Sequence, residues 1–431
     1  MMVRGLRVLY MGPSGYRAGE LSRYSFLDEE IRALADAGID AYVLSAVDGD
    51  WDRGRVHMRR LPEDSTTQRV GTLSFLARHI RHVPLANLAD PQQCYRALRI
   101  ERFASRVIER EGVSLIHSYF GWPRGYGGRL AKSETGVPLV AGLRGTDVNI
   151  VPELRYGFRL DPSYDRAVRR LLRGADRTVS VSEFLRRKAE ALGARPETAC
   201  VILKGVHLET FTAADDRLEA RQRLALGCQP LILSVGGLTP IKGLPHVLDA
   251  LRIVHASGRT FSFISCGEGP DRSALEAQAR SLGLADCTTF RGRVPRSEIG
   301  RYFRAADLLV HGSIIEASGN VLLEAMASGI PIVCTDAGGP AEYVRDGGTG
   351  FVVPVADPAA MAHAIVRLLD DPALRVQFGR AGREHAQTHF AYGRMINDTL
   401  DVYRSVLGDA KTHRAAGDEA IQSHLQPERE S

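Results

Sequence analysis

Two glutamates, Glu316 and Glu324, are the side chains of this sequence whose type and spacing point most directly to chemistry. An apolar segment at 307–312 precedes them and a second at 331–335 follows them, so a helix is predicted between two strands. The spacing alone would also fit two solvent-exposed glutamates. The strands on both sides favour a ligand site, because ligands of parallel α/β sheets bind at strand ends.

The residues between the two glutamates predict a helix start that can bind an anion. Ser318–Asn320 are poor helix-interior residues, and the apolar run after them ends at Gly329. The free N–H groups and the partial positive charge of such a start suit a diphosphate. We therefore expect phosphates beside Glu316, in contact with Gly319, Asn320, Val321 and Leu322.

A third candidate is Lys242, in a loop that follows a predicted strand at 231–235 and opens a helix. Gly237 in this loop allows the backbone to approach a ligand closely. The chain has 51 arginines and only five lysines. A lysine here suggests a position that requires a compact charge on a flexible stem.

The pattern of a glutamate, seven residues, a second glutamate, a buried strand and a Gly-Gly turn resembles the donor-binding signature of the family 4 glycosyltransferases. These are retaining enzymes with the GT-B fold, and the resemblance covers nearly the whole chain. It implies that Glu316 lies beside the transferred sugar and that Glu324 holds the ribose hydroxyls of a nucleotide.

The same resemblance implies roles for three more positions of the donor site. The family holds the diphosphate with a lysine, matched by Lys242, and with an arginine, where this chain has Gly237. That departure removes one charge-assisted contact, commonly worth about 1.5 to 3 kcal/mol. The base is expected near Val294, through backbone contacts that leave uracil and guanine equally open. Gly15, after the first strand, would face the diphosphate from the other domain.

Two loops of the first half, at 116–123 and 143–149, resemble the acceptor-side loops of the family. His117 matches a family histidine, and a catalytic or sugar-contacting role competes with a structural one, which is commoner for a lone histidine after a strand. Arg144 stands where a second histidine is common. An arginine stays protonated, so it can hold a phosphate or sugar oxygen but cannot act as a base.

The architecture expected from 431 residues is α/β, with two Rossmann-like domains facing a central cleft, as in the GT-B fold. Short apolar strands alternate with helical patterns along the whole chain. We expect an N-terminal acceptor-side domain at 1–211 and a C-terminal nucleotide-sugar domain at 212–389. A helix at 390–407 should cross back to the first domain, and a disordered tail is expected at 408–431.

The charge distribution is uneven. Residues 1–208 contain 33 Lys and Arg against 24 Asp and Glu, although the whole chain has a formal net charge of only +5. Arginines recur at helical spacing within 99–110, and a second cluster lies within 166–173. These stripes fit either a solvated face or attraction to an anionic membrane surface or a phosphate-bearing acceptor.

Composition narrows the remaining function classes. The six cysteines are scattered without metal-ligand spacing, and no apolar run approaches the ~18 residues of a membrane span. We expect no metal, no cofactor besides the nucleotide-sugar substrate, and no nucleic-acid partner. The expected location is the cytoplasm, with peripheral binding to the inner face of the cell membrane as an extension of that expectation.

The function predicted from the sequence is that of a retaining, metal-independent hexosyltransferase. It would move a sugar from a UDP- or GDP-linked donor to a glycan or a lipid-linked acceptor in cell-surface polysaccharide or glycolipid synthesis. Two alternatives stay open: a nucleotide-sugar epimerase on the same fold, and a catalytically degenerate subunit that binds nucleotide sugars. Gly237 and Arg144 motivate the second alternative.

Overall fold

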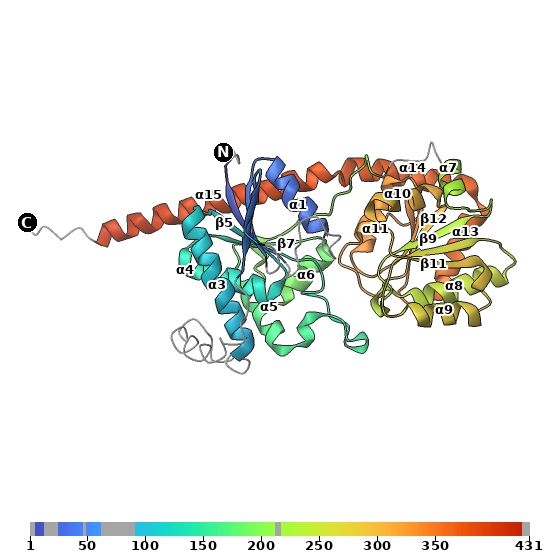
Figure 1. Cartoon of the computed structure of the whole chain (residues 1–431), viewed down its shortest axis with the longest axis horizontal. Helices are drawn as coiled ribbons and strands as arrows, with labels where there is room; N and C mark the ends of the chain where they lie inside the picture. The colour runs from blue at the N-terminus through green and yellow to red at the C-terminus, as the bar shows by residue number, and fades with distance from the viewer. Residues whose placement is uncertain (1–4, 13–24, 46–48, 62–90, 212–216, 425–431) are drawn as a thin grey trace, which may run out of the picture.

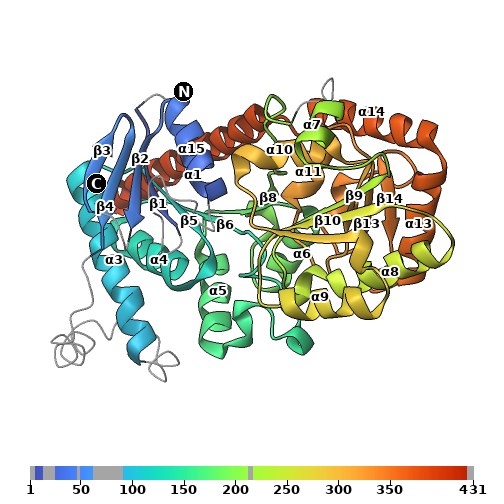
Figure 2. The same ribbon diagram turned by 45° about the vertical axis from the view of Figure 1, so that its right-hand side comes forward.

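The computed structural model describes residues 5–12, 25–45, 49–61, 91–211 and 217–424. Two sheets of mainly parallel strands, each packed with helices, form two α/β domains that lie side by side (Figure 1). The predicted pair of Rossmann-like domains is confirmed. A turn of 45° shows the two sheets and the helices between them (Figure 2).

The first domain contains, within the described residues, an eight-stranded sheet in the order β3-β4-β2-β1-β5-β6-β7-β8. Its strands are β1 (Arg7–Met11), β2 (Asp40–Ser45), β3 (Trp51–Arg53), β4 (Val56–Arg60), β5 (Leu115–Tyr119), β6 (Leu139–Gly142), β7 (Arg177–Ser180) and β8 (Ala199–Val201). Its helices are α1 (Ser25–Asp36), α3 (Pro91–Glu111), α4 (Tyr126–Thr135), α5 (Pro162–Gly174) and α6 (Glu183–Ala191). The edge strand β3 and its antiparallel neighbour β4 were not predicted.

The second domain contains, among the residues described, a six-stranded sheet in the order β11-β10-β9-β12-β13-β14. Its strands are β9 (Leu231–Val235), β10 (Ser262–Cys266), β11 (Thr288–Gly292), β12 (Leu308–His311), β13 (Ile332–Thr335) and β14 (Gly350–Val353). Its helices are α7 (Arg217–Arg223), α8 (Leu244–Ala256), α9 (Arg272–Ser281), α10 (Arg296–Ala305), α11 (Asn320–Ala327), α12 (Pro340–Tyr343), α13 (Pro358–Asp370) and α14 (Pro372–His389). All of its strand pairs are parallel.

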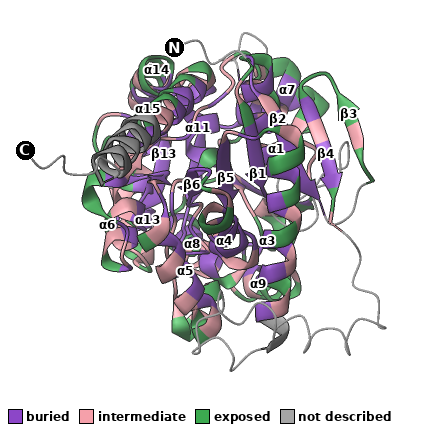
Figure 3. Cartoon of the chain, turned by 90° about the vertical axis from the view of Figure 1, so that its left-hand side faces the viewer, coloured by how far each residue is buried: buried purple, intermediate pink, exposed green. Residues whose placement is uncertain are grey.

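Burial on both faces of each sheet explains the apolar strands. In β1, Val8 and Tyr10 belong to one core cluster and Leu9 and Met11 to another, on the opposite face. All four side chains are fully buried. Such two-sided burial is why these strands read as continuous apolar runs rather than as alternating patterns, and it is visible as purple ribbon through the sheet (Figure 3).

The last helix, α15 (Tyr392–His424), leaves the second domain and packs along the first (Figure 1). Met395, Leu400 and Tyr403 are buried in the core cluster that also contains strands of the first sheet. The helix is longer than expected: 408–424 is helical, where a disordered tail was predicted. That segment is rich in helix-forming residues, and extending an existing helix carries no nucleation cost.

Two chain crossings connect the domains and lie beside each other. The N–H of Val206 donates to the carbonyl of Phe390 at 2.8 Å, and the N–H of Tyr392 donates to the carbonyl of Val206 at 3.1 Å. A Cβ at Gly205 would lie 2.7 Å from the Cα of Tyr392, so glycine permits this approach. The crossings therefore form one hydrogen-bonded connection between the domains.

Candidate functional site

Lys242 and Glu316, both predicted to line a donor site, lie together at the carboxyl edge of the second sheet. The Lys242 ammonium forms an ion pair with Oε2 of Glu316. His311 Nε2 lies 3.6 Å from the same oxygen, and the Ser313 hydroxyl lies 3.5 Å from it. Two residues that the sequence placed at one site, 74 positions apart, are thus in direct contact.

Close packing of two loops holds this pair. Lys242 ends a short 3-10 turn, and Gly243 follows it with a φ of 61°. A side chain at Gly243 would bring its Cβ to 2.0 Å from the carbonyl oxygen of Gly312, so only glycine allows the approach. Gly312 follows β12 and precedes Glu316 in the same loop. The contact between Gly243 and Gly312 therefore places Lys242 next to Glu316.

Glu316 is held as a carboxylate. Burial raises its pKa, but the Lys242 ammonium and the His311 imidazole outweigh burial and hold the pKa of Glu316 well below its usual range. The side chain is 17% exposed, so a ligand can reach it. A fixed negative charge at this position can accept hydrogen bonds from sugar hydroxyls, but it cannot donate a proton at neutral pH.

The expected helix start is formed next to this carboxylate. Helix α11 begins at Asn320, with Gly319 as its N-cap at a φ of 94°. A Cβ at Gly319 would lie 3.7 Å from Cγ of Glu316. Val321 and Leu322 have buried side chains, so only their backbone groups can serve a ligand. Asn320 is exposed at the first turn.

Glu324 lies one turn into α11 and faces the first domain. Its Oε1 accepts a hydrogen bond from Nη1 of Arg296 at 3.1 Å, and Nε of Arg296 pairs at 2.9 Å with Glu29 of α1. Burial raises the pKa of Glu324 to about 7, although Arg296 opposes the rise. The residue predicted to hold a ribose is therefore tied to the other domain through one arginine.

A small cavity of about 20 Å³ lies at this contact between the domains. Both chain crossings line it, through Gly205 and Tyr392, as do the three carboxyl side chains of Glu29, Glu30 and Glu324. Room of this size holds a water molecule but no sugar or nucleotide. In this conformation Arg296 and its partners fill the space around Glu324.

The other predicted donor residues have different outcomes. Gly237 is exposed, and an added Cβ would meet only the carbonyl oxygen of Glu268, at 3.7 Å. A side chain can therefore start at this position without a clash at its Cβ. Val294 is half-buried in the loop after β11 and packs against the core of the second domain. Gly15 lies outside the described residues.

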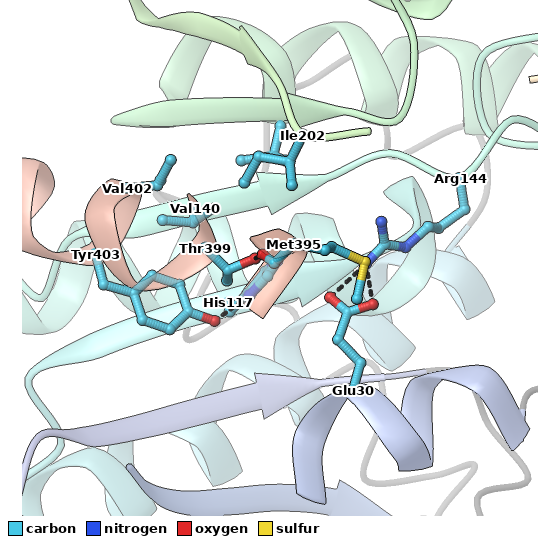
Figure 4. A pocket seen from close by; sticks show the side chains of 10 residues that line it. Glu30, His117, Val140, Arg144, Ile202, Met395, Thr399, Val402 and Tyr403 are labelled. Carbon is cyan, nitrogen blue, oxygen red and sulfur yellow. Dashed lines mark hydrogen bonds and ion pairs between the residues drawn. The ribbon is translucent and has the colours of Figure 1, made fainter. Parts of the chain in front are cut away.

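Arg144 follows β6 and is held by a buried carboxylate that the sequence analysis did not identify. Nη2 of Arg144 donates to both oxygens of Glu30, at 2.7 and 2.9 Å, and its guanidinium lies 4.9 Å from the centre of the Tyr119 ring. Lys204 Nζ donates to Glu30 at 3.1 Å. Figure 4 shows Arg144 directed at Glu30 among the side chains that line a cavity of about 10 Å³.

His117 is buried and covered in this conformation, and its predicted catalytic or sugar-contacting role stays a prediction. It lies within β5, is 2% exposed, and its Nδ1 is 2.6 Å from the Tyr403 hydroxyl of α15 (Figure 4). Burial lowers the pKa of His117 to about 3, so the ring stays neutral. In this conformation Tyr403 of α15 covers the ring, so a substrate does not reach His117 without a movement of that helix.

The loop after β6 nevertheless faces the donor side. A Cβ at Gly145 would lie 2.8 Å from Cβ of Ala317, the neighbour of Glu316. Asp147 shapes this loop, because its Oδ1 accepts the N–H groups of Arg144 and Gly145 at 3.3 and 2.9 Å. The loop predicted to face the acceptor and the loop that contains Glu316 therefore meet at the domain interface.

A second contact fixes the spacing of the domains. The carboxylate of Glu342, at α12, accepts the N–H groups of Glu183 and Phe184 at 2.7 and 2.6 Å, and so caps helix α6 of the first domain. The Tyr343 hydroxyl donates to the carbonyl of Val181 at 2.6 Å. These hydrogen bonds join α12 of the second domain to α6 and to Val181 of the first domain in this conformation.

Sequence reasoning missed Glu30, Lys204 as a charged partner, Arg296 and His311. A signal existed for Glu30, because it lies between Leu27 and Ile31 on the apolar face of the predicted helix. Lys204 is one of only five lysines. No local pattern marked Arg296, since its partners come from segments distant in the sequence.

Neither a metal cluster nor a membrane-crossing helix is found in the described part of the chain. No group of three or more His, Cys, Asp or Glu side chains there is arranged to hold a metal ion. No helix there is long and apolar enough to cross a bilayer.

Two family models match the chain in succession. Residues 25–210 match "Glycosyltransferase Family 4", and residues 216–385 match "Glycosyl transferases group 1". A D-inositol 3-phosphate glycosyltransferase of Streptomyces scabiei is 32% identical over 364 residues, covering 79% of this chain and 80% of that protein. A protein of the same name from Acidothermus cellulolyticus is 30% identical over 421 residues, covering 92% and 87%.

Solved structures share the fold. Sucrose-phosphate synthase from Thermosynechococcus elongatus superposes with a TM-score of 0.76 at 21% identity, covering 94% of this chain and all of that one. HepE from Anabaena, in complex with UDP and glucose, gives a TM-score of 0.72 at 19% identity, covering 93% and 100%. Both superpositions span the two domains, which supports the predicted GT-B arrangement.

Proposed function

This chain belongs to glycosyltransferase family 4, and from that membership we propose that it moves a sugar from a UDP- or GDP-linked donor to a glycan or lipid-linked acceptor. The observation that carries the proposal is the contact between Lys242 and Glu316 at the carboxyl edge of the second sheet, opposite the loop of Gly145. One cation and one carboxylate, placed beside a helix start, suit a diphosphate linked to a sugar.

The proposed chemistry is a transfer with retained configuration and without a metal. The bond between the anomeric carbon and the diphosphate oxygen breaks while Lys242 and the N–H groups of α11 stabilise the departing charge. The acceptor oxygen bonds to the anomeric carbon on the same face, and its proton passes to the leaving phosphate. Glu316 orients the sugar through its hydroxyls.

This mechanism assigns no general base to the protein. His117 is buried against Tyr403, and Arg144 stays protonated beside Glu30. Proton transfer to the leaving phosphate therefore accounts for acceptor activation without a side chain. Arg144 supports the acceptor side as a fixed cation next to the interface.

A thermal-shift panel with UDP, GDP and ADP, followed by a turnover assay, tests the proposal. A ligand at 100 times its dissociation constant stabilises the folded state by about 2.7 kcal/mol, so the matching base should give a clear shift. Turnover with the matching nucleotide sugar and a cell extract should release the nucleoside diphosphate and label the extract. A chain that responds to none of the three nucleotides would contradict the donor assignment.

A second candidate, a subunit that binds nucleotide sugars without transferring them, is favoured by one observation. Gly237 leaves open the space where the family places a second diphosphate cation. Nucleotide binding without release of nucleoside diphosphate or labelling of any acceptor would select this candidate.

Nucleotide binding is expected to strengthen as the pH rises through about 7. Burial raises the pKa of Glu324 to about 7, and its carboxylate form accepts ribose hydrogen bonds better than the protonated form. The dissociation constant of the matching nucleotide should fall several-fold between pH 6 and pH 8, measured by calorimetry. Glu324→Gln should abolish this dependence, whereas Glu298→Gln, on an exposed residue of α10, should keep it.

Glu324→Gln should also change the stability of the unliganded protein, and here the substitution is expected to be favourable at high pH. A carboxyl group with a raised folded-state pKa stabilises the protein below its unfolded pKa, and this contribution is lost as the pH rises through about 7. Unliganded Glu324→Gln should therefore be more stable than the wild type at pH 8, by roughly 1 to 3 kcal/mol. A variant that binds nucleotide normally at every pH would remove Glu324 from the ribose role.

We also propose that α3 helps the protein to approach an anionic membrane surface. Arg96, Arg102, Arg106 and Arg110 are exposed on this helix, while Ile100 and Val107 pack inward. Vesicles with 30% anionic lipid should retain more protein than neutral vesicles, at a physiological ionic strength, and about 0.5 M salt should abolish the difference. Equal retention by both vesicle types would contradict the proposal.

A further inference from the structure

Arg124 is a buried arginine whose charge no carboxylate balances within the described residues. It is 5% exposed and lies in the short helical turn Gly121–Gly125, between β5 and α4. Its Nη1 donates to the main-chain carbonyl of Leu44, near the end of β2. Burial lowers the pKa of Arg124 to about 10, and no charged neighbour opposes that effect.

The other strongly buried arginines show how unusual this is. Arg59 pairs with Asp52 and with Glu111, and Arg221 pairs with Asp307 at 3.2 Å. Arg144 pairs with Glu30. A buried charge without a partner is costly, and structures normally pair it or use it.

Two nitrogens of Arg124, Nε and Nη2, are placed to donate hydrogen bonds side by side to an anion. Because Nη1 is committed to Leu44, the nitrogens Nε and Nη2 remain on one edge of the guanidinium. Neither makes a hydrogen bond to the described residues, and neither is among the unpaired polar atoms sealed from solvent. Two parallel N–H donors on one edge match two oxygens of a phosphate.

The location fits a substrate group rather than a structural anion. The turn of Arg124 lies at the carboxyl edge of the first sheet, as does the loop of Gly145, which contacts the donor side at Ala317. The turn is rigid, because a Cβ at Gly121 would lie 2.4 Å from Cγ2 of Val168 and one at Gly125 would lie 2.4 Å from the carbonyl oxygen of Phe120. A fixed guanidinium at this edge is held ready for a ligand.

We propose that Arg124 binds a phosphate monoester of the acceptor through Nε and Nη2. This inference rests on the proposed function, since it names the chemistry of the acceptor in that reaction. The phosphate compensates the buried charge of Arg124, while the donor diphosphate occupies the separate site at Lys242.

Binding of inorganic phosphate, measured by calorimetry at constant ionic strength with chloride as reference, tests the site directly. Arg124→Met should weaken phosphate binding at least tenfold, and Arg124→Lys, which keeps the charge but loses the fork, should weaken it less. Arg106→Met, on an exposed arginine of α3, and Lys132→Met, on α4, should retain the wild-type affinity. Wild-type affinity in Arg124→Met, or an equal loss of binding in either control, would overturn the proposal.

The unliganded melting temperature separates ligand binding from a structural cap. If Arg124 only holds the Leu44 carbonyl, Arg124→Met should melt well below the wild type, and Arg124→Lys should bind phosphate as the wild type does. If Arg124 serves a ligand, Arg124→Lys should melt close to the wild type and still bind phosphate more weakly than the wild type, because it keeps the charge but loses the fork. The first pattern would overturn the proposal.

Phosphatase treatment of the acceptor links the site to the reaction. Removing phosphate monoesters from an acceptor extract should abolish labelling, and separate aqueous and organic phases of the extract should distinguish a soluble phosphate ester from a lipid headgroup. Undiminished labelling after treatment would sink the inference and leave the proposed transferase intact. Absence of nucleotide response in every assay would instead count against the proposed function, while phosphate binding at Arg124 could still be measured.

Discussion

Lys242→Met is expected to lower kcat/KM for sugar transfer at least 100-fold, with little change in the folded structure. The ammonium is the cation nearest to the proposed departing diphosphate, and removal of one such electrostatic contact commonly costs a factor of about 10² to 10³. Residue 237, where the resemblance implies a second cation, is a glycine, so this position cannot replace the lost charge. The loss should appear mainly in kcat, because the charge develops in the transition state.

The pH dependence of this variant distinguishes its mechanism. In the wild type, Lys242 and His311 hold the pKa of Glu316 well below its usual range, against the effect of burial. Without the ammonium, burial should raise that pKa, so Lys242→Met should lose more activity than the wild type as the pH is lowered. A parallel acid limb in wild type and variant would contradict the coupling of the two residues.

Lys132→Met provides a matched control. The side chains of Lys132 and Lys242 are both 28% exposed, and each pairs with a carboxylate, Asp176 and Glu316 respectively. Lys132 lies on α4, away from the domain interface. The control should keep wild-type kcat/KM, and a comparable loss in both variants would show that the effect is not specific to the donor site.

Gly237→Arg should restore part of the activity that Lys242→Met loses. The space beside Gly237 is open, and its backbone is outside the left-handed region, so a side chain can be added without strain. In the Lys242→Met background the new guanidinium should restore part of the lost kcat/KM, because it supplies a cation from the same loop. This would show that the diphosphate lies between the two positions.

The elements that carry Glu316 and Lys242 could be predicted largely because their features are local. The strand before Glu316, the helix start at Asn320 and the strand after it are contiguous, and each follows from turn chemistry and apolar runs. Lys242 was found because a strand, a glycine-rich turn and a rare residue type coincide. The structure then brings these separate loops into contact through Gly243 and Gly312.

The acceptor side could not be predicted as well because its contacts join distant segments. Glu30 lies 114 residues from Arg144 and 174 residues from Lys204. Tyr403 covers His117 although the two residues are 286 positions apart, and a local sequence pattern cannot predict such a contact. The helical extension beyond Leu407 was missed because helix propensity, and not apolar periodicity, sustains it.

Glu30→Gln is expected to lower the free energy of unfolding by about 3 to 5 kcal/mol. Its carboxylate is 3% exposed and serves Arg144, Lys204 and the Tyr119 hydroxyl together. Removing one partner of a buried ion pair leaves uncompensated charge, which is the costly case. Glu29→Gln is a matched control on the same helix, since that side chain is 33% exposed and should change stability by under about 1 kcal/mol.

The acid dependence of this loss follows from the pKa of Glu30. Burial raises that pKa, but Arg144 and Lys204 outweigh burial and lower it to about 2. A depressed carboxyl pKa contributes stability above the unfolded value, near 4.5, and the contribution is lost as the pH falls towards 2. In urea titrations the gap between wild type and Glu30→Gln should therefore be full at pH 7 and shrink between pH 4.5 and pH 2.

A double variant shows which charge causes the loss. Burial lowers the pKa of Lys204 to about 8, so this ammonium is the more easily neutralised of the two cations that Glu30 holds. Glu30→Gln/Lys204→Met should be more stable than Glu30→Gln alone, because one orphaned cation is gone while Arg144 keeps its stacking on Tyr119. Additive losses in the double variant would show that Glu30 and Lys204 do not stabilise each other.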